Sequence, residues 1–541
     1  MRTEKVYLYD TTLRDGTQGE GISLSVEDKV KIAMRLDQLG IDYIEGGWPG
    51  SNPKDMAFFE RMREIPLAHA RIAAFGSTCR PGVEAHEDEN LRCLLDSGVK
   101  VATIFGKSWD LHVTQALKTT LNENVRMVTD SVRFLKQHGL TVVFDAEHFF
   151  DGYKQNPVYA LRVLEAAEEA GADWLVLCDT NGGSLPHEIF DAVHTVKESV
   201  SLPIGIHTHN DGELAVANAL SAVQAGARQV QGTINGIGER CGNSNLISVI
   251  ANLQLKLGYS CVESEKLQQL TKLSRYVADI ANMTLPGNQP FVGNSAFAHK
   301  GGIHVSAVLK NPQTYEHLEP EAVGNQRRVL VSELAGQSNL FAKVDELQLP
   351  FDRTSADAKA VMKEIKEREF HGYQYEGAEA SLSLMLLEAG GKLRELFTLD
   401  SFKILMEKTV GKQIVSEAMV KLRINGQRMH TAAEGNGPVN ALDNALRKAL
   451  ESHFPSLKEM HLTDYKVRVL DESEATAAKV RVLIESAKNG EKWSTVGVST
   501  NVIEASWEAL VDSIRYLLWK DGCEIGHSDH PADMRIGIVN H

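Results

Sequence analysis

Eight short β-rich runs alternate with helical patterns through roughly the first 240 residues, and this alternation limits the folds open to the chain. The runs occupy residues 6–12, 43–49, 71–77, 101–107, 141–147, 174–180, 204–210 and 229–235. Several helical patterns end in glycine, as a helix C-cap favours, at Gly40, Gly171 and Gly226. Eight strand–helix units predict an α/β fold that closes into a TIM (β/α)8 barrel over residues 1–284. An open doubly wound sheet is the competitor, but no G-x-G-x-x-G follows the first strand.

The rest of the chain differs in composition from the barrel region. The 541 residues are too many for a single hydrophobic core, so further domains are expected. Residues 285–345 are rich in Gly, Asn and Pro, which indicates ordered loops, and residues 354–390 have a helical pattern. We therefore predict linker subdomains over residues 285–400.

An internal repeat marks the C-terminal part, residues 401–541. Segment 416–450 matches segment 479–514, with Asn425-Gly426 in the first copy corresponding to Asn489-Gly490 in the second. Each copy predicts a strand, an Asn-Gly turn, a second strand and a helix. This pattern is typical of an α+β module that binds an effector or forms a dimer, so residues 401–541 are predicted to be a regulatory and dimerisation domain. A purely structural dimerisation domain is the alternative.

Charge and cysteine usage exclude several classes of function. The net charge of −15 disfavours nucleic acid and anionic membrane surfaces as partners. No apolar run approaches the ~20 residues that a membrane span needs, and the N-terminus MRTEKVYLYD is not expected to be a signal peptide. The six cysteines are scattered without a C-x-x-C pair. These features predict a cytoplasmic protein without disulfides or a zinc ribbon.

Polar residues, among them Glu45 and Asp145, gather where the predicted strands end, which is where barrel enzymes carry their active sites. His207 and His209 are two residues apart at the end of the seventh run, so their side chains share one face. With Asp15 after the first run they offer one carboxylate and two imidazoles to a divalent cation, and Asn243 adds an amide oxygen. This ligand set suits Mn²⁺, Mg²⁺, Zn²⁺ or Co²⁺ without selecting among them. The alternative is structural, with Asp15 capping a helix and the histidines packed as polar core.

Arg14 precedes the predicted metal ligand Asp15 and can place a guanidinium over the same cavity. There it could pair with a carboxylate or stabilise an enolate. A surface salt bridge is the alternative role for this side chain.

Four features together resemble the family of 2-isopropylmalate, homocitrate and citramalate synthases: TTLRDGTQ at 11–18, the H-T-H pair, GERCGN at 238–243 and the duplicated C-terminal module. The resemblance covers nearly the whole chain. Within the family, EGGWPGSNPKD at 45–55 looks like the long citramalate synthase branch. The resemblance implies metal ligands Asp15, His207 and His209 with Asn243 in the sphere, catalytic residues Arg14, Glu147, His304 and Tyr315, and substrate-binding residues Arg14, Gln18 and Thr180.

The implied activity is an acyl transfer in which acetyl-CoA condenses with pyruvate and water then cleaves the thioester, giving (R)-citramalate for isoleucine biosynthesis. The proton-abstracting base stays open, with His304, oriented by Glu147, as the candidate. The resemblance further implies a homodimer and an amino-acid effector, isoleucine, at the C-terminal domain. A 2-isopropylmalate synthase, with 2-oxoisovalerate as acceptor and leucine as effector, is the alternative within the family.

Three hypotheses that place the chain in another functional class have less support in the sequence. Hydroxymethylglutaryl-CoA lyase uses a similar barrel for a cleavage, but it lacks the duplicated domain and carries Gly-Cys-Pro where this chain has Gly242-Asn243 after Cys241. Metal-dependent amidohydrolases carry their H-x-H on the first strand and not the seventh. A sensor that has lost its reaction is disfavoured because every expected catalytic position is filled.

Overall fold

The computed structural model describes residues 4–351, 357–408, 410, 414–470 and 478–523. Contacts divide the chain into two compact units. The first comprises Met1–Phe297 and Leu318–Arg327, and the second comprises Ala298–His317 and Arg328–His541. None of the helices in the described part is both long enough and apolar enough to cross a membrane.

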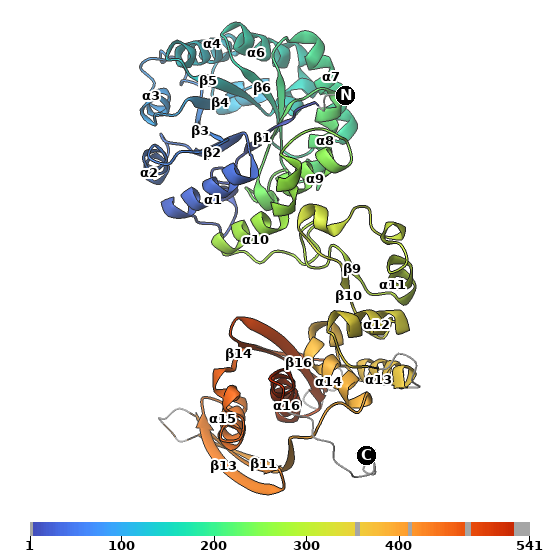
Figure 1. Ribbon diagram of the computed structural model, residues 1–541. Helices are drawn as coiled ribbons and strands as arrows, with labels where there is room; N and C mark the ends of the chain where they lie inside the picture. Colours follow the sequence, from blue (N-terminus) through green and yellow to red (C-terminus); the bar gives the residue numbers. More distant parts are fainter. Residues whose placement is uncertain (1–3, 352–356, 409, 411–413, 471–477, 524–541) are drawn as a thin grey trace. The chain divides into compact units, whose positions relative to one another are not determined.

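Eight parallel strands form a closed barrel in the first unit, which confirms the predicted fold (Figure 1). Each strand pairs with the next, and β1 also pairs with β8 to close the ring. The strands are β1 (Tyr7–Asp10), β2 (Tyr43–Gly47), β3 (Arg71–Ser77), β4 (Val101–Lys107), β5 (Thr141–Glu147), β6 (Trp174–Asp179), β7 (Ile204–Thr208) and β8 (Gln229–Gly232).

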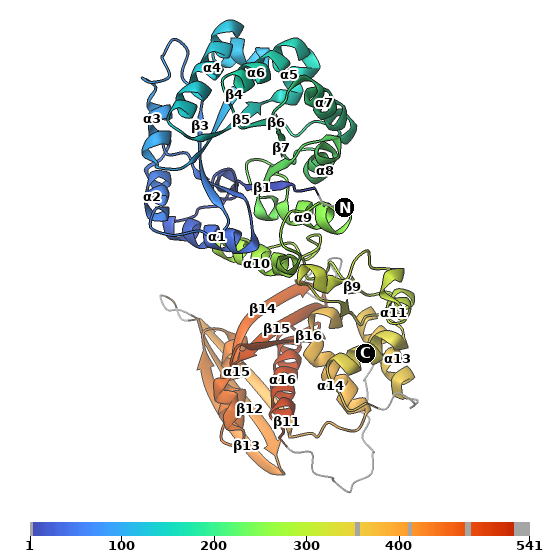
Figure 2. The ribbon, with the colours of Figure 1, turned by 45° about the horizontal axis from the view of Figure 1, so that its top comes forward.

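Helices cover the outside of this barrel (Figures 1 and 2). They are α1 (Val26–Leu39), α2 (Pro53–Met62), α3 (Glu89–Asp96), α4 (Leu121–Gln137), α5 (Phe149–Gln155), α6 (Pro157–Glu169), α7 (Pro186–Ser199), α8 (Ala215–Ala225), α9 (Leu246–Leu255) and α10 (Leu270–Ile280). One apolar cluster joins strands to helices, and a second, with Tyr9, Val143 and Trp174 among its members, comes from the strands alone. The barrel interior is thus packed, and room for a ligand is left only toward the strand ends.

Local sequence signals set the helix ends. Ser25 caps α1 in a capping box with Asp28, and Gly40 ends this helix at φ 101°. Gly171 and Gly226 also take positive φ values, 97° and 124°. The glycine C-caps predicted from the sequence are therefore confirmed.

Short helices and two-residue strands open the second unit. They are β9 (Ala298–His299), α11 (Gly302–Val308), β10 (Arg328–Val329), α12 (Gln337–Glu346), α13 (Asp357–Phe370) and α14 (Glu379–Ala389). The region predicted as ordered loops thus contains α11 and α12. Helix α12 begins where Asn339 Oδ1 accepts the backbone N–H of Gly336 at 3.2 Å, a capping signal inside a Gly-rich stretch.

The duplicated module is present as predicted (Figure 2). The first copy contains β12 (Ile414–Ile424), β13 (Gln427–Gly435) and α15 (Pro438–Leu450), and the second contains β15 (Val480–Lys488), β16 (Glu491–Ser499) and α16 (Val502–Lys520). Both Asn-Gly turns have two consecutive positive φ values, at Asn425-Gly426 and Asn489-Gly490. Each sheet also holds one strand that the sequence comparison missed, β11 (Phe397–Lys408) or β14 (His461–Val469).

Candidate functional site

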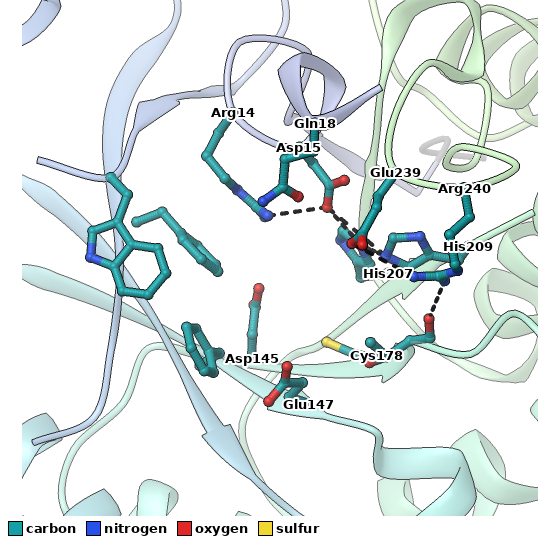
Figure 3. A pocket seen from close by; sticks show the side chains of 14 residues that line it. Arg14, Asp15, Gln18, Asp145, Glu147, Cys178, His207, His209, Glu239 and Arg240 are labelled. Atoms are coloured by element: carbon teal, nitrogen blue, oxygen red, sulfur yellow. Dashed lines mark hydrogen bonds and ion pairs between the residues drawn. The ribbon is translucent and has the colours of Figure 1, made fainter. Parts of the chain in front are cut away.

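A cavity of about 200 Å³ opens at the carboxyl ends of the barrel strands. Its polar side chains point toward one another from strands that are far apart in sequence (Figure 3). It is lined by Arg14, Asp15, Gln18, Trp48, Phe75, Phe105, Asp145, Glu147, Cys178, Thr180, His207, His209, Glu239 and Arg240. The set includes every residue that the sequence placed at the strand ends as a metal ligand, catalytic or binding group, apart from Asn243.

Asp15, His207 and His209 form a buried cluster (Figure 3). Asp15 Oδ2 lies 3.6 Å from His207 Nε2 and 4.0 Å from His209 Nε2, and the two imidazole nitrogens are 3.3 Å apart. Asp15 begins a short 3-10 helix without a side-chain capping hydrogen bond, so it does not serve as a helix cap. The carboxylate instead faces the histidines, as predicted.

The protonation of the cluster suits a divalent cation. Burial opposes ionisation of Asp15, but Arg14 and the two histidines lower the pKa of its carboxyl to about 2. Burial, followed by the neighbouring imidazole of His207, lowers the pKa of His209 to about 4. At pH 7 the cluster therefore contains a carboxylate and at least one neutral imidazole with a lone pair to offer.

Asn243 completes the surroundings of Asp15. Its Nδ2 donates to Asp15 Oδ1 at 2.9 Å, while its Oδ1 is buried and has no hydrogen-bond partner among the described residues. A buried acceptor without a donor costs free energy unless a cation or water satisfies it. The residues present thus fit a divalent ion held by Asp15, His207 and His209, with the amide oxygen of Asn243 nearby.

A hydrogen-bond chain orients His207 from behind. Its Nδ1 lies 2.9 Å from Gln231 Oε1, and Gln231 Nε2 donates to Asp145 Oδ1 at 3.0 Å. Because the Gln231 oxygen can only accept, Nδ1 of His207 donates to it, and Nε2 faces Asp15 and His209. Burial and the carboxylate of Glu45 raise the pKa of Asp145 well above its ordinary value, which favours its neutral form.

Arg14 is a buried part of this cavity and not a surface cation. Its Nε donates to Glu45 Oε1 at 2.5 Å and its Nη1 to Asp15 Oδ2 at 3.1 Å, and the guanidinium lies 3.8 Å from the centre of the Phe75 ring. Burial alone would lower the pKa of Arg14, but the carboxylates of Glu45 and Asp15 raise it above its ordinary value. A permanent positive charge is therefore fixed beside the cluster.

Three aromatic rings form the apolar wall of the cavity. Trp48 meets Phe75 and Phe105 edge-on, each at 5.7 Å between ring centroids, and the two phenylalanines stack at 5.4 Å. The indole Nε1 donates to Asn90 Oδ1 at 2.6 Å, and the backbone N–H of Trp48 donates to Asp55 Oδ2 at 2.9 Å. The wall is thus anchored at both the ring and the backbone of Trp48.

The remaining predicted barrel residues also face the cavity. Glu147 forms an ion pair with Lys107, a partner that the sequence reasoning missed. Thr180 Oγ1 accepts the backbone N–H of His148 at 2.9 Å, and Gln18 ends the short helix that follows Asp15. At the rim, Arg240 donates to both oxygens of Asp211 and to the carbonyl oxygen of Thr180.

His304 and Tyr315 lie in the second unit. Their rings stack at 4.2 Å between centroids with an interplanar angle of 28°, and both side chains are exposed. These two predicted catalytic residues are therefore neighbours in the structure.

Several functional side chains escaped the sequence reasoning. They are Lys107 and Gln231, which hold Glu147 and His207, and the three rings of the wall. Glu45 and Asp145 were expected at the strand ends, but their contacts with Arg14 and Gln231 were not. Gln231 could have been found from the sequence, because a polar residue inside a strand of a packed barrel needs a buried partner.

Three family models match consecutive parts of the chain. The HMGL-like model matches residues 5–277, the homocitrate synthase post-HMGL domain-like model matches residues 291–371, and the LeuA allosteric (dimerisation) domain matches residues 376–518. The closed barrel with its carboxylate–imidazole cluster thus defines an enzyme of the HMGL-like class, extended by a LeuA-type domain.

Full-length relatives specify the group within this class. The chain is 58% identical over 520 residues to the (R)-citramalate synthase of Aquifex aeolicus, covering 96% of this chain and 98% of the relative. It is 54% identical to that of Geobacter sulfurreducens, covering 95% and 98%. A probable 2-isopropylmalate synthase of Methanopyrus kandleri is 32% identical, covering 95% and 98%. The chain belongs to the (R)-citramalate synthase family.

Proposed function

We propose that this enzyme condenses the acetyl group of acetyl-CoA with pyruvate and hydrolyses the thioester, giving (R)-citramalate and free CoA. The observation that carries the proposal is a small cavity in which a metal-binding cluster and a fixed guanidinium face an aromatic wall. A 2-oxo acid offers two oxygen-bearing groups to the polar side and an alkyl group to the apolar side. The two (R)-citramalate synthases that are 58% and 54% identical to this chain support the same reaction.

Asp15, His207 and His209 would hold a divalent ion such as Mn²⁺, Mg²⁺, Zn²⁺ or Co²⁺, with Asn243 contributing its amide oxygen. When bound, this ion supplies Lewis-acid polarisation of the 2-oxo acid carbonyl. Gln231 keeps His207 in the tautomer that this role requires. Thr180 and Gln18 are proposed to bind the substrate carboxylate.

Arg14 is proposed to stabilise the negative charge that develops during condensation. Two of its nitrogens are held by Glu45 and Asp15, while Nη2 makes no hydrogen bond to a described residue. Because the guanidinium is already oriented and desolvated, it can stabilise an enolate or alkoxide without reorganising.

The reaction needs a base that takes a proton from the acetyl methyl group. The methyl carbon then bonds to C2 of pyruvate, whose carbonyl electrons become an alkoxide, and water cleaves the C–S bond to release the thiol. We propose His304 as the base, with Tyr315 assisting, and Glu147 as a further catalytic residue of the barrel. The pH profile of a His304→Asn variant tests this assignment, since loss of the base removes the acidic limb of the profile, where protonation of the base lowers the rate.

Shrinking the aromatic wall should broaden the acceptor range. Trp48→Ala is expected to raise the ratio of kcat/KM for 2-oxoisovalerate to that for pyruvate by roughly 10- to 100-fold, because a pocket discriminates one or two methyl groups by ~1–3 kcal/mol. Trp48→Phe keeps most of the wall and serves as the matched control. The measurement is thiol release with a panel of pyruvate, 2-oxobutyrate, 2-oxoisovalerate and 2-oxoglutarate. A wild-type preference for 2-oxoisovalerate would contradict the proposed substrate.

We propose that the enzyme is a homodimer formed through its LeuA-type domain. The match to a dimerisation domain supports this, as do large apolar side chains exposed on β11 and at the start of β12. Their exposed fractions are about one half, at Leu405, Met406, Ile414 and Val415. Apolar patches of this kind mark protein interfaces.

Isoleucine is the proposed effector of this domain. An effector acts only by binding one conformation more tightly than another, so inhibition should appear as a saturable loss of activity in the intact enzyme. Isoleucine is expected to inhibit at lower concentration than leucine when each is titrated against the full-length protein at fixed pyruvate and acetyl-CoA. Stronger inhibition by leucine, or none by isoleucine, would refute the assignment. The intact chain is the right sample because Val496 belongs to the same apolar cluster as residues of α12 and α14, so deleting residues 401–541 would open that core.

A further inference from the structure

Two arginines lie directly opposite each other on neighbouring strands of the second unit. Arg468 on β14 is the register partner of Arg481 on the antiparallel strand β15. Side chains in this relation share one face of the sheet, and like charges there destabilise the strand pair. Burial and the charge of Arg468 lower the pKa of the Arg481 guanidinium, in the direction that such repulsion gives. The pair therefore needs a compensating negative charge.

Elsewhere in the same unit the chain supplies such a charge itself. Arg423 on β12 is opposite Arg428 on β13. The carboxylate of Asp400 bridges them, with Oδ1 2.9 Å from Arg423 Nε and Oδ2 3.0 Å from Arg428 Nε. One oxyanion placed between two guanidinium groups thus satisfies an opposed arginine pair in this fold.

No described carboxylate occupies that position between Arg468 and Arg481. Arg481 donates instead to neutral acceptors, the carbonyl oxygen of Gly372 and, at 2.7 Å, Oε1 of Gln374. Within the described part of the chain, Arg468 makes neither an ion pair nor a side-chain hydrogen bond. Glu369 and Glu333 lie nearby as a hydrogen-bonded pair that shares its charge: burial and Glu333 raise the pKa of Glu369 to about 7, whereas the hydrogen bond with Glu369 lowers the pKa of Glu333. Neither carboxylate forms a described ion pair with Arg468 or Arg481.

Both arginines line a cavity of about 490 Å³, and all the residues that line it belong to the second unit. Two further cations face the same space. Lys300 is balanced by Glu376 at 2.5 Å, whereas Lys366 forms no ion pair with a described residue. The lining thus holds four cations, Lys300, Lys366, Arg468 and Arg481, against three carboxylates, Glu333, Glu369 and Glu376. In a chain with a net charge of −15, a local excess of positive charge favours the binding of an anion.

We propose that this cavity binds a small organic anion with at least two negative charges, and that one of its oxyanion groups bridges Arg468 and Arg481 as Asp400 bridges Arg423 and Arg428. The shared chemistry is a carboxylate or phosphate oxyanion. The ammonium group of Lys366 would pair with the second negative charge of the anion. The site is additional to the barrel cavity and to the proposed isoleucine site.

The test measures binding to the full-length protein by calorimetry in a low-salt buffer, with pyrophosphate and citrate as probes of the two oxyanion types. Saturable binding is expected for at least one probe, and the tighter one identifies a phosphate or a carboxylate ligand. Arg468→Gln should weaken this binding roughly ten-fold or more, since it removes a charge-assisted contact. Only binding that Arg468→Gln weakens is assigned to the cavity, because the barrel cluster can also attract these anions.

Arg428→Gln is the matched control, because it removes a guanidinium whose counter-charge is built into the chain. It should leave anion binding unchanged. Without anion, Arg468→Gln is expected to raise Tm by relieving the repulsion, whereas added anion should raise the Tm of the wild type more than that of the variant. The proposal is overturned if neither probe binds saturably, or if Arg428→Gln weakens binding as much as Arg468→Gln does.

Discussion

Replacing His209 with alanine is expected to remove the bound divalent ion and to lower kcat by at least about a thousand-fold, because Lewis-acid polarisation of a carbonyl contributes several kcal/mol. The fold should survive, since His209 lies just after β7 and outside the apolar clusters of the barrel. The measurements are metal content after loading with Mn²⁺, kcat from thiol release, and Tm.

His194→Ala provides the matched control, because this imidazole is exposed on α7 with a side-chain accessibility of 60%. It should change neither metal content nor kcat. Exhaustive chelation of the wild type should likewise abolish activity, and Mn²⁺ should restore it. Full activity in enzyme shown to be free of metal would exclude the proposed role of the cluster.

The cluster of Asp15, His207 and His209 could be predicted because it depends on rules that act over short distances in sequence or topology. Alternation along a strand places His207 and His209 on one face. Barrel closure then pairs β1 with β8 and β8 with β7, which brings Asp15 within 3.6 Å of His207. The eight-strand pattern therefore predicts that Asp15 lies beside His207 and His209, although nearly 200 residues separate it from them in the sequence.

The hydrogen bonds and the aromatic rings around that cluster could not be predicted in the same way. Gln231 bonds to His207, and Asp145 bonds to Gln231, only when their side chains adopt particular torsion angles. The spacing of residues in the sequence does not reveal those angles. The aromatic wall likewise combines rings from the end of β2, from β3 and from β4. From the sequence, Trp48 could be interpreted only as part of a stretch typical of one family branch.

The strands β11 and β14 were missed for a different reason. A strand is recognised when apolar residues alternate toward a core, but most side chains of both strands are exposed in the described chain. The repeat also aligned the strands of each copy that make the most contact with their helix, namely β12 and β13 with α15, and β15 and β16 with α16.

Asp55→Ala is expected to lower the free energy of unfolding by roughly 3–5 kcal/mol, because it leaves the buried ammonium of Lys29 without its counter-ion. Lys29 is fully buried, pairs with Asp55 and donates to the carbonyl oxygen of Gly46 at 3.0 Å. The measurement is urea unfolding of wild type and variant. Glu27→Ala is the matched control, since it breaks the exposed Arg61–Glu27 pair, which joins the same two helices, α1 and α2. Its cost should stay below about 1 kcal/mol.

A double variant, Lys29→Met with Asp55→Leu, separates the effect of the ion pair on the stability of the fold from its effect on the position of Trp48. Replacing a buried ion pair by apolar side chains of similar size is often neutral, so most of the lost stability should return. The acceptor for the Trp48 backbone N–H is still missing, however, so the anchoring of the wall is not restored. The double variant should therefore regain most of the stability that Asp55→Ala loses and yet accept 2-oxoisovalerate better, as Trp48→Ala does. If stability and pyruvate preference both recover, the ion pair supports only the fold, and the wall is held by Asn90 and ring packing alone.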